Sequence, residues 1–315
     1  MAEQSDSDAD AKYARALAGG CRFWYTVFAK HLKKTQEGAE TTMDQSIKRA
    51  YAKLNLTLGV LYKRADGYHA LDSIMQTVDL FDTVTVERAR EILVTSTGMV
   101  LPYDNTLRRA AEGYRALTGR SAFIRVVKRI PAEAGLGGGS ADAAAALNAL
   151  QELYGELDEK ALLELAAKVG ADVPFCLRGG TQRAEGIGEV LTPVRGMQLH
   201  LLLAKPAEGV STKKLFSLLK LPREMPDTVQ ALKALSDGDM DALCPLLFNA
   251  LEEPAIELVP EIGRIKRDML ALGARAACMS GSGSAVFGVF DSLSQAKEAK
   301  EKLTQVAFCH ACESI

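Results

Sequence analysis

The sequence predicts an α+β protein made of two domains, with the boundary near residue 198. The chain has 315 residues, and single domains usually have about 100–200 residues. Its first half contains a strand, a glycine-rich loop and an alanine-rich helix in succession, at 122–130, 135–140 and 141–150. After Pro193 the order changes to one strand, several helices, and two strands around a second glycine-rich loop. This mixture of elements is typical of two α+β domains.

Composition excludes several classes of protein. The formal net charge is −2, so the chain offers no broad positive field for DNA or RNA. No apolar segment approaches the roughly 20 residues that span a bilayer, and the N-terminus does not resemble a secretory signal. We therefore expect a cytoplasmic protein that binds neither nucleic acid nor a membrane.

The six cysteines also indicate a reducing compartment, because they are scattered rather than arranged as a dense disulfide framework. Cys309 and Cys312 form a Cys-x-x-Cys pair with His310 between them. A zinc site normally needs a second pair of ligands, and the sequence shows no matching pair. We predict that these two residues are packed thiols.

Residues 1–46 differ from the rest of the chain. They begin with acidic and polar residues, and they contain one short aromatic cluster, Phe23, Trp24, Tyr25 and Phe28. We predict a flexible N-terminal extension, and Met43 is an alternative start of the protein. The other interpretation is a docking segment that uses the aromatic cluster.

A regular pattern begins at residue 50. Between 52 and 60, leucine and valine alternate with Lys53, Asn55 and other residues, and this period of two predicts a strand with one apolar face. Lys53 and Asn55 therefore project from the same, opposite face. A lysine in this position is usually only solvated, and a catalytic role is the alternative. A turn at 64–67 and a short strand at 84–87 follow.

Helices are predicted where apolar residues recur with helical spacing. The helix at 105–117 can be capped by Asp104 or Asn105 and ended by Gly119, and a helix at 158–169 is ended by Gly170. The second half is predicted to contain strands at 200–204, 276–279, 285–290 and 305–311, and helices at 212–219, 227–234, 260–272 and 293–303.

The strongest functional signal is the segment 135–140, which we call the glycine loop. Four glycines within five residues let backbone N–H groups approach an anion with no Cβ in the way. The helix that follows adds unpaired N–H groups, and Ser140 can either cap this helix or turn its hydroxyl to a phosphate. The loop lacks the lysine of a Walker A motif, and Ser140 stands where a dinucleotide fingerprint needs glycine or alanine. We predict a phosphate site rather than a tight turn.

Two other segments have two interpretations each. The sequence Gly170-Ala171-Asp172-Val173-Pro174 places Asp172 at a helix start, where an aspartate is usually an N-cap. The alternating serines and glycines at 280–284, the second glycine loop, can wrap a phosphate or can simply make a turn.

Taken in order, four of these segments resemble the GHMP kinase superfamily. They are Lys53-Leu54-Asn55, the phosphate-loop pattern P-x3-G-L-G-S/G-S starting at Pro131, and the segments 170–174 and 279–283. The resemblance extends from residue 47 to the end. It implies an ATP-binding, ribosomal-protein-S5-like N-terminal domain at 47–198 and a ferredoxin-like α/β sandwich domain at 199–315. It also implies ATP as co-substrate, with Mg²⁺.

Finer features narrow the resemblance. The sequence Arg-Ala-Asp-Gly-Tyr-His at 64–69, Asp104-Asn105 and the segments 184–189 and 209–212 resemble one group of GHMP kinases. That group phosphorylates the 2-hydroxyl of a methylerythritol linked to cytidine diphosphate, in the non-mevalonate route to isoprenoid precursors. The resemblance therefore implies a small-molecule cytidine diphosphate substrate. We expect a monomer or weak homodimer.

The resemblance also implies roles for individual residues. Asp172 matches the general base that acts on the acceptor hydroxyl, and Lys53 matches the cation beside it. Phosphoryl transfer depends mainly on positioning and charge stabilisation, and a well-placed base contributes about 10²–10⁴-fold. Tyr68 and Phe216 match rings that sandwich the cytosine, and His69 matches a residue that hydrogen-bonds the base edge.

The remaining matches concern binding. Asn55 and Thr212 are expected to contact the substrate, and Asn105 and Lys128 are expected near the adenine. The ATP phosphates are expected along one continuous segment, which is Pro131, Ala132, Glu133, Ala134, Gly135, Leu136, Gly137, Gly138, Gly139, Ser140 and Ala141.

Two features depart from the family's pattern. Residues 1–46 have no counterpart in it, and the loop begins with Ala132-Glu133-Ala134 where relatives often carry more glycine. An inward Glu133 would repel ATP, so we expect its side chain to face solvent. No carboxylate cage for Mg²⁺ is evident, so the metal ligands are left unassigned. The rival functions are a kinase for another alcohol, a non-catalytic nucleotide-binding protein, and a dinucleotide-dependent oxidoreductase.

Overall fold

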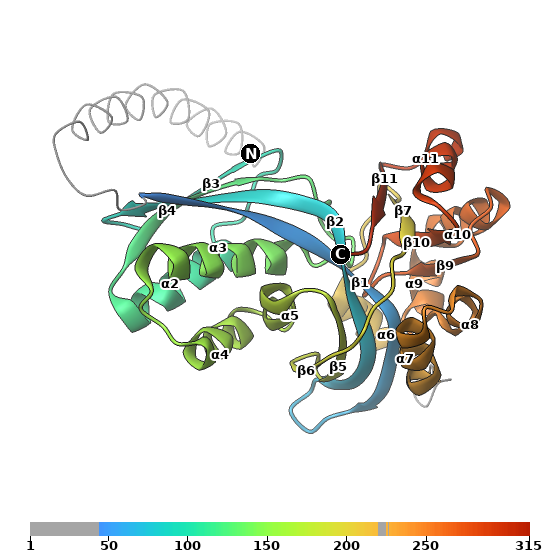
Figure 1. Cartoon of the computed structure of the whole chain (residues 1–315), viewed down its shortest axis with the longest axis horizontal. Coiled ribbons are helices and arrows are strands. Elements are labelled where there is room, and N and C mark those ends of the chain that lie inside the picture. Colours follow the sequence, from blue (N-terminus) through green and yellow to red (C-terminus); the bar gives the residue numbers. More distant parts are fainter. Residues whose placement is uncertain (1–43, 220–224, 226) are drawn as a thin grey trace, which may run out of the picture. The chain divides into compact units, whose positions relative to one another are not determined.

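A long antiparallel hairpin runs through the computed structural model of the chain, which describes residues 44–219, 225 and 227–315 (Figure 1). Its strands are β1 (Gln45–Lys63) and β2 (His69–Ala89). The predicted strands at 52–60 and 84–87 are parts of this hairpin, and the predicted turn at 64–67 joins its strands. β1 begins at Gln45, inside the predicted extension. The aromatic cluster at 23–28 and Met43 lie outside the described residues.

The hairpin is the centre of a seven-stranded sheet. The strand order is β3-β4-β2-β1-β8, and β5 pairs with the first half of β2 while β4 pairs with its second half. The other strands are β3 (Leu93–Thr97), β4 (Ser121–Val127), β5 (Thr181–Gly186), β6 (Val190–Pro193) and β8 (Phe248–Asn249).

Four helices lie along one face of this sheet (Figure 1). They are α2 (Thr106–Thr118), α3 (Gly138–Tyr154), α4 (Glu159–Val169) and α5 (Val173–Arg178). The predicted caps of α2 are confirmed, because the Asn105 side chain accepts a hydrogen bond from the N–H of Arg108 and Gly119 has a left-handed φ of 74°. Helix α3 extends beyond the predicted 141–150 at both ends.

A second sheet has the order β11-β7-β10-β9, and its strands are all antiparallel. They are β7 (His200–Lys205), β9 (Ala276–Met279), β10 (Val286–Phe290) and β11 (Phe308–Glu313). Helices connect β7 to β9 and β10 to β11, which confirms the predicted ferredoxin-like arrangement. The last strand begins later than the predicted 305, because Gln305 has a positive φ of 56° that interrupts an extended chain.

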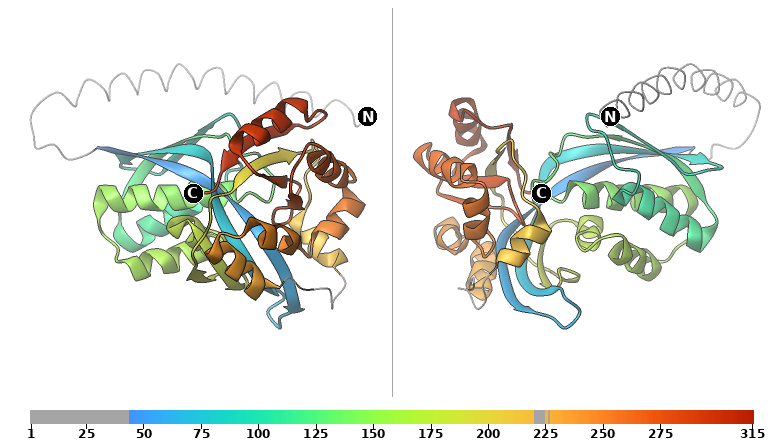
Figure 2. Two further views of the ribbon diagram at one scale, coloured as in Figure 1. Left: turned by 45° about the vertical axis from the view of Figure 1, so that its right-hand side comes forward. Right: turned by 180° about the vertical axis from the view of Figure 1, so that it is seen from behind.

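The helices of the second half include α10 and α11, which pack on this sheet (Figure 2). No helix in the described part of the chain combines the length and apolar character needed to cross a membrane. The elements are α6 (Thr212–Leu218), α7 (Thr228–Asp237), α8 (Met240–Leu243), the short 3-10 helix η1 (Cys244–Leu246), α9 (Glu252–Leu258), α10 (Glu261–Ala271) and α11 (Leu293–Lys302).

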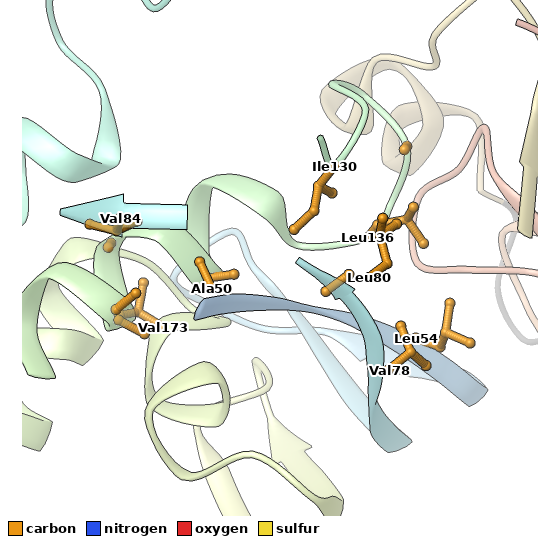
Figure 3. Packing of buried hydrophobic residues seen from close by; sticks show 14 of the residues in the cluster. Ala50, Leu54, Val78, Leu80, Val84, Ile130, Leu136 and Val173 are labelled. Carbon is orange, nitrogen blue, oxygen red and sulfur yellow. The ribbon is translucent and has the colours of Figure 1, made fainter. Parts of the chain in front are cut away.

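Strand β1 contributes to two cores. Leu54 and Leu56 pack with the helices of the first half, in the cluster seen in Figure 3, while Leu58 and Val60 pack with the second sheet and its helices. The change follows an irregularity in the β1–β2 register between Asn55 and Thr57. The strand is therefore buried on both faces here, and the prediction of a single apolar face was wrong.

The Cys-x-x-Cys segment lies on β11. Residues three apart on a strand point to opposite faces, so Cys309 packs toward the core that contains α11 and Cys312 toward the core of the first sheet. Both thiols are free, which confirms the prediction of packed thiols. Burial raises the pKa of Cys309 to about 11 and that of Cys312 to about 12.

Candidate active site

The glycine loop joins the region after β4 to helix α3. Leu136 anchors it, since its side chain is 1% exposed and packs into the main core. Gly137 occupies the N-cap position of α3 in a left-handed conformation, and no side chain caps the helix. The capping role considered for Ser140 is therefore wrong. The first backbone N–H groups of the helix and the Ser140 hydroxyl remain available to an anion.

A cavity of about 610 Å³ lies beside this loop. Every residue from 131 to 140 lines it, together with Asn105 and Lys128. Ala141 does not line the cavity, because it faces the core and is 2% exposed. Glu133 is exposed and has a positive φ of 50°, but it also lines this cavity, so the expectation that its side chain turns away from ATP stays a prediction.

Two aspartates that the sequence did not point to hold Lys128 in the wall of this cavity. The ammonium donates to the carboxylate of Asp82 and, at 2.6 Å, to Asp142 Oδ2. Burial disfavours the charged ammonium, but the two carboxylates outweigh this effect and the pKa of Lys128 is raised. Asp82 also accepts hydrogen bonds from the N–H groups of Arg129 and Ile130, so this cluster fixes the chain as it enters the glycine loop.

The second glycine loop packs directly against the first. Ser280 Oγ donates to the carbonyl of Gly135 at 3.0 Å, and the N–H of Ala285 donates to the carbonyl of Ala134 at 3.2 Å. A Cβ on Gly135 would lie 2.0 Å from the carbonyl oxygen of Ser280. Gly135 is therefore required by this contact, and the second loop supports the first rather than simply reversing the chain.

Lys53 and Asp172 come together beside the glycine loop. Lys53 Nζ lies 3.3 Å from Asp172 Oδ2, and the side chain of Lys53 is 6% exposed. Its stem passes so close to the loop that a Cβ on Gly137 would lie 2.8 Å from Lys53 Cγ. The interpretation of Lys53 as a solvated lysine was therefore wrong. Its polar end reaches the carboxylate through a gap that only a glycine leaves open.

Asp172 occupies the N-cap position of α5, but its side chain makes no capping hydrogen bond. Its conformation explains this, because ψ is −8° rather than the extended value that usually turns a cap side chain back to the helix. The carboxylate instead faces Lys53 and remains 28% exposed. Asp172 therefore stands at the predicted N-cap position without capping the helix, and its carboxylate is free to meet a ligand.

A chain of buried hydrogen bonds holds the lysine. Lys53 Nζ donates to Asn55 Oδ1 at 2.6 Å, Asn55 Nδ2 donates to Ser73 Oγ at 2.8 Å, and Ser73 Oγ donates to the carbonyl of Thr57 at 2.6 Å. Asn55 is 2% exposed, so its amide serves mainly to orient the lysine. Its predicted contact with substrate stays a prediction.

A second cavity, of about 830 Å³, opens from the Lys53–Asp172 pair. At its other end the ring of His69 is stacked on Phe216, with centroids 4.9 Å apart, while Tyr68 is 62% exposed. Burial lowers the pKa of His69, and the nearby Lys63 lowers it further. The structure thus brings all three residues of the predicted base site to one end of one cavity.

The two cavities meet at the glycine loops. Gly135, Gly137, Thr212 and Ser282 line both of them. Thr212 Oγ1 and Ser282 Oγ are 2.7 Å apart, so the start of α6 is tied to the second glycine loop at this junction. A phosphate held by the first loop would therefore lie next to whatever the second cavity presents to Asp172.

Two family models match this chain. The family model for the GHMP kinases N terminal domain matches residues 105–180, and that for the GHMP kinases C terminal domain matches residues 231–307. The 4-diphosphocytidyl-2-C-methyl-D-erythritol kinase of Carboxydothermus hydrogenoformans is 44% identical over 264 residues, which cover 81% of this chain and 92% of that protein. This chain belongs to the 4-diphosphocytidyl-2-C-methyl-D-erythritol kinase family. The enzyme of the same name from Alkaliphilus metalliredigens is 41% identical, over 83% of this chain and 94% of that protein.

Solved structures agree with membership of this kinase family. A crystal structure of 4-(cytidine 5'-diphospho)-2C-methyl-D-erythritol kinase superposes with a TM-score of 0.75 at 36% identity, covering 85% of this chain and 99% of that one. A homoserine kinase from Cytophaga hutchinsonii, at 20% identity and a TM-score of 0.71 over 89% of this chain and 97% of that one, shares the fold. The predicted two-part GHMP kinase fold is confirmed.

Proposed function

We propose that this chain transfers the γ-phosphoryl group of ATP to the 2-hydroxyl of 4-diphosphocytidyl-2-C-methyl-D-erythritol. The observation that carries the proposal is the junction of the two cavities. The phosphate-binding loop lines one, the Lys53–Asp172 pair lines the other, and both share Gly135 and Gly137. The relatives at 44% and 41% identity carry the name of this kinase.

The chemistry follows from this arrangement. The glycine loop and the start of α3 hold the phosphates of ATP through backbone N–H groups. Asp172 accepts the proton of the acceptor hydroxyl as its oxygen attacks the γ-phosphorus, and the bond between that phosphorus and the ADP oxygen breaks. Lys53 stabilises the negative charge that develops on the transferred group. Asn55 acts as a positioning residue, because it accepts a hydrogen bond from Lys53 and so orients the lysine.

Mg²⁺ accompanies ATP in this proposal. The described residues contain no group of three or more His, Cys, Asp or Glu side chains that could hold a metal ion. Such an ion would arrive on the phosphates and keep several waters, and the Ser140 hydroxyl, which lines the 610 Å³ cavity, would offer it a protein oxygen. The ion would supply charge neutralisation on the β- and γ-phosphates.

The cytosine is assigned to the other end of the 830 Å³ cavity. Tyr68 and Phe216 supply ring faces, and the lowered pKa of His69 keeps its imidazole neutral, so that one ring nitrogen donates and the other accepts a hydrogen bond. At the ATP end, Asn105 and the Lys128 cluster are assigned to the adenine.

A coupled assay of ATP consumption tests the function. We expect Mg²⁺-dependent ADP release with 4-diphosphocytidyl-2-C-methyl-D-erythritol and little with homoserine, mevalonate or sugars. Turnover with one of those alcohols but not with the cytidine compound would make this chain a kinase of different specificity. Absence of turnover with all of them, in a protein that binds ATP, would favour a non-catalytic nucleotide-binding role. Binding of NADH but not ATP would favour the oxidoreductase.

A further inference from the structure

The walls of the substrate cavity carry a net positive charge. Three lysines and one aspartate line the 830 Å³ cavity, which gives its walls a fixed charge of +2. The proposed substrate joins its two organic parts through a diphosphate diester, which carries two negative charges at neutral pH. Burying such a diphosphate is costly unless cations meet it. One of the three lysines is therefore expected to bind the phosphates.

Lys53 already has two partners within the protein. Its ammonium contacts Asn55 and Asp172 at the reacting end of the cavity. Lys63 belongs to the opposite end, because it pairs with His69 across the β1–β2 hairpin and lowers the pKa of that imidazole. Neither of these two ammonium groups therefore lies at the middle of the cavity, where the diphosphate is expected.

Lys213 lies between these ends. It follows Thr212, whose hydroxyl contacts the second glycine loop, and it precedes by three residues Phe216, which stacks on His69. Residues three apart on a helix share a face, so Lys213 and Phe216 both project into the cavity that they line. The rise from Lys213 to Phe216 along the helix is about 4.5 Å, which is comparable to the length of a diphosphate bridge.

Among the described residues, Lys213 has no interaction partner. Its side chain is exposed, and none of the described residues supplies it with a carboxylate or a hydrogen-bond acceptor. An ammonium group without a partner, in the wall of a cavity that must accept two negative charges, is suited to bind an anion. Nothing in the packing of α6 requires a lysine here, since Leu215 is the residue that this helix buries.

We propose that the ammonium of Lys213 binds the diphosphate of the substrate and so selects nucleoside diphosphate esters over the bare nucleoside. The inference rests on the proposed function, because that function sets which end of the cavity takes the base. Lys213 acts on ground-state binding and not on the phosphoryl transfer itself. Its loss should therefore raise KM for the cytidine substrate with little change in kcat.

The test compares CDP with cytidine as ligands of the full-length protein, by isothermal titration calorimetry at low salt. In Lys213→Ala we expect the affinity for CDP to fall by about 10-fold and that for cytidine by less than about 2-fold, since one charge-assisted contact is lost. Lys213→Arg should restore most of the CDP affinity. Lys214→Ala is the matched control, because Lys214 is the next residue of the same helix and does not line the cavity.

Three results would overturn the inference. They are unchanged CDP binding in Lys213→Ala, an equal loss for CDP and cytidine, and a loss of CDP preference in Lys63→Ala but not in Lys213→Ala. These outcomes are separate from failure of the proposed function. That failure would appear as absent phosphorylation of the cytidine compound by the unaltered protein, whatever the binding data show.

Discussion

Replacing Asp172 by asparagine tests the proposed chemistry most directly. The substitution keeps the size of the side chain but removes its ability to accept a proton. A positioned base contributes about 10²–10⁴-fold to catalysis, which corresponds to about 2.7–5.4 kcal/mol of activation free energy. We therefore expect kcat of Asp172→Asn to fall by about 100- to 10,000-fold.

The fold should tolerate this change. The carboxylate makes no capping hydrogen bond and is 28% exposed, and the Lys53 ammonium keeps its hydrogen bond to Asn55, so we expect the free energy of unfolding to fall by no more than about 1–3 kcal/mol. The measurements are steady-state ATP turnover with the cytidine substrate, together with urea unfolding. Folded Asp172→Asn should bind ATP normally and turn over slowly.

Asp158→Asn is the matched control. Asp158 also stands at a helix start, but its side chain does cap its helix by accepting from the N–H of Ala161. Asparagine is an equally good cap, so neither activity nor stability should change. Turnover within about 3-fold of the unaltered enzyme in folded Asp172→Asn would refute the assignment of the base. Unfolding of Asp172→Asn would instead show that the carboxylate is needed by the structure.

Three further predictions concern the loop, the buried cluster and the base site. Gly137→Ala should abolish most activity and lower stability by more than Gly119→Ala does. Both glycines have a φ near 70°, but of the two only Gly137 would bring an added Cβ against a neighbour, at 2.8 Å. Comparing the unfolding and the turnover of the two variants therefore separates the effect of backbone strain from that of steric conflict. Burial raises the pKa of Asp142 from 3.8 to about 7. Between these pH values the folded protein holds a proton that the unfolded chain has released, so the free energy of unfolding falls as pH rises from about 4 to 7. Asp142→Asn should flatten this dependence in urea unfolding from pH 5 to 8, and an unchanged slope would contradict the assignment. Phe216→Ala should raise KM for the cytidine substrate by about 10-fold without changing KM for ATP, because base stacking contributes about 1–3 kcal/mol; an equal rise in both values would argue against its role at the base.

Much of the fold could be predicted from local patterns. Strand β9 was predicted to the residue, and α2 was predicted with both of its caps, because the signals for these elements lie within them. The strands β3, β5, β6 and β8 were missed. They are short, and β3 and β6 are partly exposed, so their side chains carry no strong alternation.

The site was less accessible to the same reasoning. Local patterns made Lys53 a solvated residue and Asp172 an N-cap, and only the family resemblance paired them. The reason is physical, since their contact depends on how β1 and α5 pack and not on either segment alone. Asp82 and Asp142 were missed for the same reason, because a buried ion cluster is visible only once its members are brought together.

The glycines of the first loop have a second cause that the sequence alone does not show. The loop was predicted from the need of a phosphate for backbone N–H groups, yet Gly135 and Gly137 are also required by the protein itself. One lets the Ser280 carbonyl approach, and the other lets the Lys53 stem pass. Gly135 and Gly137 line both cavities, so under the proposed function a side chain at either position would push apart the groups that react. In the proposed reaction the loop therefore sets the distance between phosphate and acceptor as well as holding the phosphate.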